Sequence, residues 1–191
     1  NYDSVAELEG ARRMVQAAVD EYGGIDILIC NAGILRDKTL QNMTVEMWND
    51  VMNVHLNGTF YCTKAAYDRM IEQGRGGRIL CTSSASGLFG NFGQTNYGAA
   101  KAGIAGFVRC LWQEGQKHKI TVNGIAPGAF TRMTEDLLPG GESGDFAKKW
   151  RPEHVSPVVV WLCSDEAAGV TGRIFSLHGN EVSLVEPVRT K

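Results

Sequence analysis

Tyr97 and Lys101 are the two residues whose types and spacing most clearly permit chemistry. They stand four positions apart, which in a helix places both side chains on one face, one turn from each other. An ammonium group beside a phenol stabilises the phenolate and lowers a pKa that is otherwise about 10. The pair predicts a tyrosine that exchanges protons near neutral pH, and a chance pairing on a surface helix is the alternative.

Ser84 adds a third functional group, thirteen residues before Tyr97. The apolar run 78–81 is typical of a buried strand, so Ser84 is expected just beyond its carboxyl end. Ligands of open α/β sheets bind at that edge. A hydroxyl there can bond a substrate carbonyl while the tyrosine transfers a proton. The neighbouring Ser83 and Ser86 are interpreted as parts of a polar turn.

Short apolar runs alternate with helical patterns around these residues. Strands are expected at 25–30, 78–81, 120–125 and 174–177, and helices at 4–22, 44–72, 95–116 and 152–165. Ser4 and Thr44 are expected to cap their helices, and 136–146 is expected to be a mobile loop. This alternation predicts an α/β fold with a Rossmann-like, doubly wound parallel sheet, in a single domain over 1–191.

Composition excludes several classes of function. The formal net charge is −2 with no basic run, so no nucleic-acid partner is expected. No apolar stretch reaches the roughly 20 residues of a membrane span, so no membrane partner is expected. The four histidines lack metal-ligand spacing, so we expect no metal site. Five cysteines without a Cys-x-x-Cys pair favour a reducing, cytoplasmic location.

The chain resembles the short-chain dehydrogenase/reductase family. The resemblance rests on Ser84, Tyr97 and Lys101, on the turn Cys30-Asn31-Ala32-Gly33 after an apolar run, and on Pro127-Gly128 after the next strand. It extends from about Asn1 to about Asn180. It implies that Tyr97 is the general acid/base, that Lys101 tunes Tyr97 and holds the nicotinamide ribose, and that Ser84 polarises the carbonyl.

The same resemblance implies a dinucleotide cofactor, NAD, with NADP left open. The implied cofactor-binding residues are Asp3, Ser4, Asn31, Ala32, Gly33, Tyr97, Lys101, Pro127, Gly128 and Thr131. For Thr131, capping of a following helix is an equally good interpretation.

His55 marks a departure from the family pattern. The family has a catalytic asparagine where this chain has the histidine of Val54-His55-Leu56-Asn57-Gly58. His55 is therefore a candidate catalytic residue in place of that asparagine, and a structural histidine bonded to backbone is the alternative. Histidine at this position is also typical of the (3R)-hydroxyacyl-CoA dehydrogenase domains of peroxisomal multifunctional enzymes and their bacterial relatives, which the motifs around 31–37 and 83–94 resemble.

The glycine-rich turn of a dinucleotide fold does not occur before residue 30. We therefore expect the chain to be the carboxyl-terminal portion of the domain, without its first strands. An apolar sheet edge and two bare sheet faces are expected as a consequence.

Three functions remain open. The first is NAD-dependent oxidation of a (3R)-hydroxyacyl-CoA, an acyl thioester. The second is reduction of a 3-oxoacyl carrier protein with NADPH. The third is an inactive remnant that acts through subunit association. The resemblance implies a homodimer or homotetramer formed through the helices at 44–72 and 95–116, and a peroxisomal location is possible for a longer eukaryotic chain.

Overall fold

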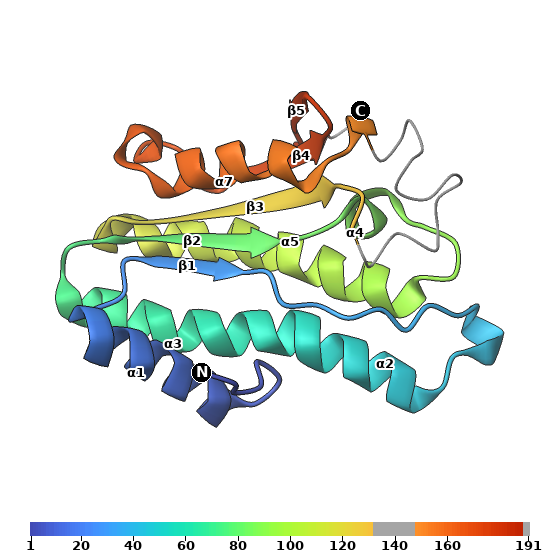
Figure 1. Cartoon of the computed structure of the whole chain (residues 1–191), viewed down its shortest axis with the longest axis horizontal. Coiled ribbons are helices and arrows are strands. Elements are labelled where there is room, and N and C mark those ends of the chain that lie inside the picture. Colours follow the sequence, from blue (N-terminus) through green and yellow to red (C-terminus); the bar gives the residue numbers. More distant parts are fainter. Residues whose placement is uncertain (132–147, 189–191) are drawn as a thin grey trace.

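A five-stranded sheet forms the centre of the computed structural model, which describes residues 1–131 and 148–188. Its strands lie side by side in chain order, the first four parallel and the last antiparallel (Figure 1). They are β1 (Ile27–Cys30), β2 (Gly77–Thr82), β3 (Ile120–Gly128), β4 (Ile174–His178) and β5 (Glu181–Leu184). The predicted Rossmann-like parallel sheet is confirmed. The strand β5 was missed because all four of its residues are exposed and it has no buried apolar run.

Helices cover both faces of this sheet (Figure 1). The helices α1, α3 and α5 share one core with Ile79, Val122 and Ile174, and α7 packs on the opposite face against Leu80 and Ile125. Among the described residues, no helix is long and apolar enough to cross a membrane. The helices are α1 (Leu8–Tyr22), α2 (Val45–Met52), α3 (Gly58–Gln73), α4 (Ala85–Phe89), α5 (Thr95–Gly115) and α7 (Ser156–Cys163).

The long helix expected at 44–72 contains a π-helical segment, η2 (Asn53–Asn57), between α2 and α3. The amide of Gly58 bonds the carbonyl of Asn53, five residues earlier. Thr44 caps α2, as predicted, with its hydroxyl accepting from the amide of Met47 at 3.2 Å. Such single π turns occur often at functional sites.

Two expected helix starts are wrong. Ser4 does not cap α1, because its hydroxyl accepts from the amide of Ala6 in a separate turn and α1 begins at Leu8. Pro152 begins a 3₁₀ turn, η6 (Pro152–His154), and α7 begins only at Ser156. The loop expected at 136–146 lies outside the described residues. The remaining 3₁₀ turns are η1 (Leu40–Asn42), η3 (Gln116–His118) and η7 (Asp165–Ala167).

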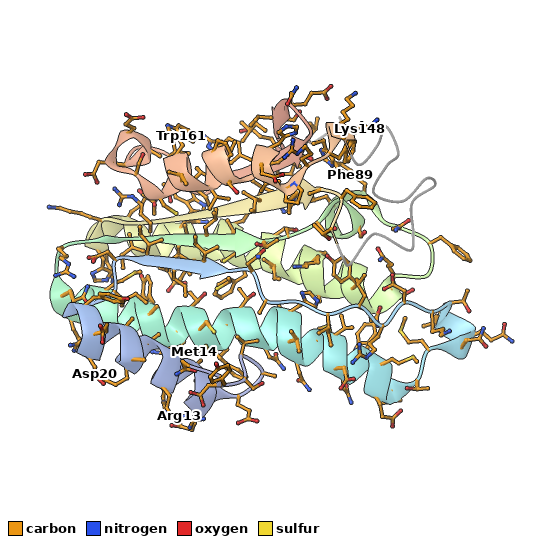
Figure 2. The ribbon with its side chains drawn as sticks, viewed as in Figure 1. Arg13, Met14, Asp20, Phe89, Lys148 and Trp161 are labelled. Carbon is orange, nitrogen blue, oxygen red and sulfur yellow. The ribbon has the colours of Figure 1, made fainter. Side chains whose placement is uncertain are left out.

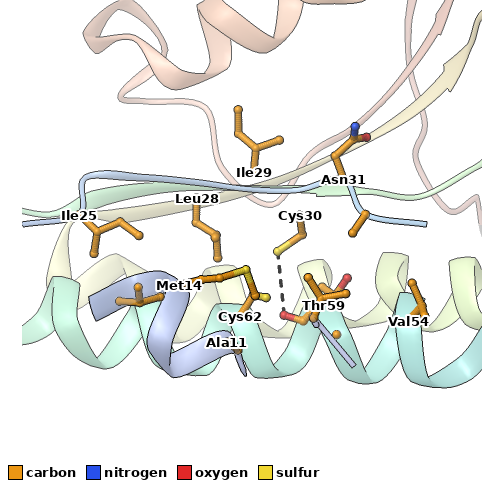
Figure 3. A pocket seen from close by; sticks show the side chains of 14 residues that line it. Ala11, Met14, Ile25, Leu28, Ile29, Cys30, Asn31, Val54, Thr59 and Cys62 are labelled. Carbon is orange, nitrogen blue, oxygen red and sulfur yellow. Dashed lines mark hydrogen bonds between the residues drawn. The ribbon is translucent and has the colours of Figure 1, made fainter. Parts of the chain in front are cut away.

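The edge strand β1 has one covered and one bare face. Figure 3 shows Leu28 and Cys30 pointing toward the helices and Ile29 pointing away from them. Ile29 is 44% exposed, and Ile27, which alternation along the strand places on the same face, is 47% exposed. The expectation of two bare faces is therefore wrong, because α1 folds back over the sheet beside α3.

Candidate active site

The carboxyl ends of three parallel strands meet at one edge of the sheet. The strand register pairs Cys30 of β1 with Cys81 of β2, and Thr82 of β2 with Ile125 of β3. The turn that begins at Asn31 therefore lies beside Ser83 and Ser84, and the end of β3 lies next to them. This edge is where open α/β sheets bind ligands.

Ser84 is held against Tyr97 by a close contact between two helices. Its hydroxyl accepts from the amide of Ser86 at 3.2 Å and caps the short helix α4, which the sequence did not predict. Gly87 of α4 lies directly on α5, where an added Cβ would come within 2.6 Å of the backbone of Lys101. Only glycine permits this approach. Ser84 consequently lies close enough to the phenol of Tyr97 to lower its pKa.

Lys101 is buried beneath Tyr97, with 3% of its surface exposed. Its Nζ donates to the carbonyl of Thr82 at 2.6 Å and lies 5.5 Å from the centroid of the Tyr97 ring. The Ser83 hydroxyl donates to the Lys101 carbonyl at 2.8 Å, so Ser83 is structural. Burial lowers the pKa of Lys101 to about 8, because a charged ammonium loses hydration in the interior.

The pKa of Tyr97 departs from the expected direction. Burial raises it above the ordinary value of 10, the hydrogen bond with Ser84 lowers it, and the negative charge of Asp37 raises it further. The sequence-based prediction that Lys101 lowers the pKa of Tyr97 is therefore wrong for this structure, in which the pKa is raised. The physical reason is that loss of hydration penalises the phenolate more than the hydrogen bond stabilises it.

The π segment places His55 next to Tyr97. The two rings meet edge to face with centroids 5.1 Å apart, and His55 is 2% exposed. Its Nε2 lies 2.8 Å from the Ile34 carbonyl oxygen and 3.1 Å from the Ile34 amide nitrogen, while its buried Nδ1 has no partner among the described residues. Burial, with Lys101 nearby, lowers the pKa of His55 to about 4, so the ring is neutral at physiological pH.

The turn after β1 packs closely on this histidine. A Cβ on Gly33 would come within 2.5 Å of His55 Cε1, so only glycine fits there. Asn31 Oδ1 accepts from the Thr82 hydroxyl at 3.0 Å, and Asn31 and Ala32 are exposed. Contacts with His55 and Thr82 thus hold the inner side of the turn, while Asn31 and Ala32 on its outer side are exposed.

The other residues expected to bind a cofactor are less closely gathered. The Asp3 carboxylate pairs with Arg13, whose Nε donates to it at 2.7 Å, and this hydrogen bond is the main reason why the pKa of Asp3 is lowered. Ser4 lies next to it in the turn before α1. Pro127 and Gly128 end β3 and are half-buried, and Thr131 is the last residue described before the gap at 132–147.

A cavity of about 170 Å³ lies between β1, α1 and α3 (Figure 3). Its lining is mostly apolar, with Met14, Leu28 and Cys62 among the side chains that face it. Val5, Asn31 and Ala32 also line the cavity, so the segment after Asp3 lies beside the turn that begins at Asn31.

Sequence reasoning missed the residues that hold the start of α5. Gln94 Nε2 donates to Asp37 Oδ2 at 2.6 Å, and Asn96 Nδ2 donates to the carbonyls of Arg36 and Met47 at 3.1 and 3.2 Å. The signal available was a pair of amide side chains directly before Tyr97.

Comparison with known proteins gives concordant results. The sequence model of the short chain dehydrogenase family matches residues 3–140. The chain is 45% identical over 190 residues to mouse peroxisomal multifunctional enzyme type 2, covering all of this chain and 25% of that protein. It is 39% identical over 177 residues to an acetoacetyl-CoA reductase of Acinetobacter, covering 90% of this chain and 71% of that protein.

A solved structure agrees with the fold. The crystal structure of a short chain dehydrogenase from Mycobacterium avium superimposes with a TM-score of 0.88 at 39% identity, and the match covers all of this chain and 65% of that chain. The chain thus spans less than two thirds of that structure and a quarter of the mouse protein. The matched residues include Ser84, Tyr97 and Lys101, and the chain belongs to the short-chain dehydrogenase family.

Proposed function

We propose that this protein is an oxidoreductase that transfers a hydride between NAD and the C3 position of a (3R)-hydroxyacyl-CoA. The observation that carries the proposal is the junction of α4 and α5, where Gly87 of α4 lies on the backbone of Lys101 and Lys101 Nζ lies 5.5 Å from the centroid of the Tyr97 ring, with Ser84 at the start of α4 lowering the pKa of Tyr97. This trio stands at the carboxyl edge of the sheet, beside the exposed turn at Asn31.

The residues at this edge fit a nicotinamide dinucleotide. Among the described residues, the bond to the Thr82 carbonyl is the one that Lys101 Nζ makes, so further donor hydrogens are available to ribose hydroxyls. The exposed backbone at Asn31 and Ala32 can approach the adenosine, and Pro127 and Gly128 would line the nicotinamide. When bound, the dinucleotide accepts or supplies the hydride.

Tyr97 holds the proton that the reaction moves. In oxidation, its phenolate takes the proton of the substrate C3 hydroxyl, and in reduction its phenol returns it. Ser84 donates to the same oxygen and stabilises the charge that develops there. Lys101 is protonated below pH about 8, so its ammonium favours the phenolate once a ligand brings the groups together.

We propose that His55 takes part in proton transfer on the side of Tyr97 that faces away from the substrate. Its Nε2 holds the turn through Ile34, and its Nδ1, which has no partner among the described residues, is the atom available for proton exchange in a ring 5.1 Å from that of Tyr97. His55 would then replace the asparagine that the family has at this position.

The acyl thioester follows from two lines of support. The motifs around 31–37 and 83–94, with His55, resemble the hydroxyacyl-CoA dehydrogenase branch. The Acinetobacter relative is named for an acyl-CoA substrate. The choice of NAD over NADP rests on the resemblance to that branch.

The test measures the turnover of four reactions by the protein purified from its own cells. These are oxidation of (3R)-3-hydroxybutanoyl-CoA with NAD or NADP, and reduction of a 3-oxoacyl carrier protein with NADH or NADPH. The proposal predicts fastest turnover of the CoA ester with NAD, and slower turnover of its (3S) isomer. Turnover of the carrier protein with NADPH alone would support the reductase instead. Absence of turnover in all four reactions would contradict both.

A further inference from the structure

The segment after the cofactor-side turn is tied by hydrogen bonds to the segment that enters α5. The Lys38 amide donates to the Gly93 carbonyl at 2.9 Å, and the two segments form a parallel β-bridge at Lys38 and Gln94. The side chain of Gln94 donates to Asp37 Oδ2 at 2.6 Å. Tyr97 is the third residue of α5, so these bonds act on the helical turn that carries it.

Gln94 is the centre of this connection and is 7% exposed. Its Oε1 accepts from the Ser86 hydroxyl at 2.7 Å and from Asn91 Nδ2 at 3.0 Å, while its carbonyl accepts the Gly98 amide at 2.7 Å. The side chain of Gln94 thereby joins α4, the loop after α4 and Asp37, and its backbone carbonyl joins them to the start of α5. A buried group with all of these partners satisfied fixes one arrangement of the elements that it joins.

Accepting a hydrogen bond from Gln94 does not explain why residue 37 carries a carboxylate. Its Oδ2 accepts from Gln94, but its Oδ1 is buried without a partner among the described residues. A neutral amide would accept the same bond at a lower desolvation cost. The carboxylate charge lies close enough to Tyr97 to act on its ionisation.

We propose that Asp37 and Gln94 are a positioning pair: the bond between them ties the segment after β1 to the first turn of α5, fixes the place of Tyr97 and holds the Asp37 carboxylate beside that turn. The kinetic consequences rest on the proposed oxidoreductase function. Neither residue touches the reacting atoms, so both act through Tyr97.

Among the described residues, four groups face Tyr97 from the elements packed around it. Lys101 lies on α5, His55 on η2, Ser84 at the start of α4, and Asp37 on the segment after β1. His55 is neutral above pH about 4 and Ser84 does not titrate, so Asp37 and Lys101 carry the opposing charges near neutral pH. Removing the Asp37 charge should lower the pKa of Tyr97, and oxidation, which needs the phenolate, should then begin at lower pH.

Two substitutions separate charge from position. Asp37→Asn keeps an oxygen for Gln94 but removes the charge, and should move the pH midpoint of oxidation down by about half a unit to one unit. Gln94→Ala removes the connection and should lower kcat about ten- to a hundredfold, with KM for the dinucleotide within about twofold. Gln94→Glu, which keeps the acceptor for Ser86 and Asn91 but repels Asp37, serves if the alanine variant does not fold.

The chain offers a matched control on α1. Gln16 Nε2 donates to Asp20 Oδ1 at the same 2.6 Å in an exposed pair on α1, where Figure 2 shows Asp20. Gln16→Ala and Asp20→Asn should leave kcat and the pH midpoint unchanged.

A second readout is independent of turnover. The ultraviolet absorbance of tyrosinate, taken as the difference between each protein and its Tyr97→Phe counterpart, reports the ionisation of Tyr97 alone. Asp37→Asn should lower this midpoint by the same amount. A lowered midpoint without turnover in any protein would support the pair and contradict the proposed function. A midpoint unchanged by Asp37→Asn, or a kcat of Gln94→Ala and Gln94→Glu equal to that of Gln16→Ala, would overturn the proposal.

Discussion

The region around Tyr97 is buried and polar, whereas the edge of the sheet at β1 is exposed and apolar. Around Tyr97 the interior is polar, with Lys101 and His55 3% and 2% exposed. At β1 the surface is apolar, with Ile27 and Ile29 nearly half exposed on a strand that stands at the edge of the described sheet. Buried polar groups cost stability unless they are bonded.

The difference shows where this chain gives up stability for chemistry. The polar groups near Tyr97 are held in place by named partners, and burial lowers the pKa of His55 to about 4 and that of Lys101 to about 8. Such shifts gather at functional sites. The margin at β1 has no such groups, and its apolar residues resemble those of an interior strand.

The largest expected effect contrasts the apolar residues exposed at β1 with those buried at the centre of the sheet. Leu80→Ala on β2 removes a side chain buried against α7 and should lower the free energy of unfolding by about 2–5 kcal/mol. Ile29→Ala on β1 removes a side chain that is already half exposed and should cost less than about 1 kcal/mol. Urea unfolding of both variants measures the difference. Equal losses would show that the face of β1 is covered in the protein.

The buried charge of Lys101 should appear as a dependence of stability on pH. The folded pKa is about 8 and the ordinary value 10.5, so between these pH values the unfolded chain holds a proton that the folded chain has released. Stability therefore rises with pH in that window, by up to about 3 kcal/mol at about 1.4 kcal/mol per pKa unit. Lys101→Met should lack this rise. Parallel stability curves for the two proteins would contradict the assigned burial.

His55 should make the stability of the fold depend on pH in the acid range. Its folded pKa is about 4 against an ordinary 6.5, so the unfolded chain binds the proton first as the pH falls. Stability is complete above pH 6.5 and should decline by up to about 3 kcal/mol toward pH 4. His55→Gln, compared with the parent by urea unfolding at each pH, should decline less. An identical decline would mean that His55 is accessible to water.

The smallest expected effect concerns Asp3, on the cofactor side. If its carboxylate accepts from the adenine, Asp3→Asn should raise KM for NAD about three- to tenfold and leave kcat unchanged. Arg13→Gln is the matched control, because it frees the carboxylate without removing it. A KM unchanged in Asp3→Asn would confine Asp3 to its pair with Arg13.

The parts of the fold visible in the sequence are those set by local patterns. The four parallel strands were predicted because each is a short apolar run, and the spacing of Ser84, Tyr97 and Lys101 predicted their grouping once α5 was recognised as a helix. The π turn around His55 was not predictable, because its five-residue hydrogen bond depends on packing against the turn at Gly33.

Long-range polar contacts were equally invisible. Asp37 and Gln94 are 57 residues apart, and nothing local to either indicates the other. The raised pKa of Tyr97 also required the structure, because burial opposes the effect that the tyrosine–lysine spacing predicts.

The central claim is that Tyr97 transfers the proton at C3, and Tyr97→Phe tests it most directly. The substitution keeps the ring that faces His55 and removes only the hydroxyl. Oxidation of (3R)-3-hydroxybutanoyl-CoA with NAD by the parent and the variant, both checked for unchanged circular dichroism, is the measurement. The account predicts a fall in kcat of at least about a hundredfold, since general acid/base groups contribute 10²–10⁴-fold. A variant that keeps more than about a hundredth of the parent rate would contradict it.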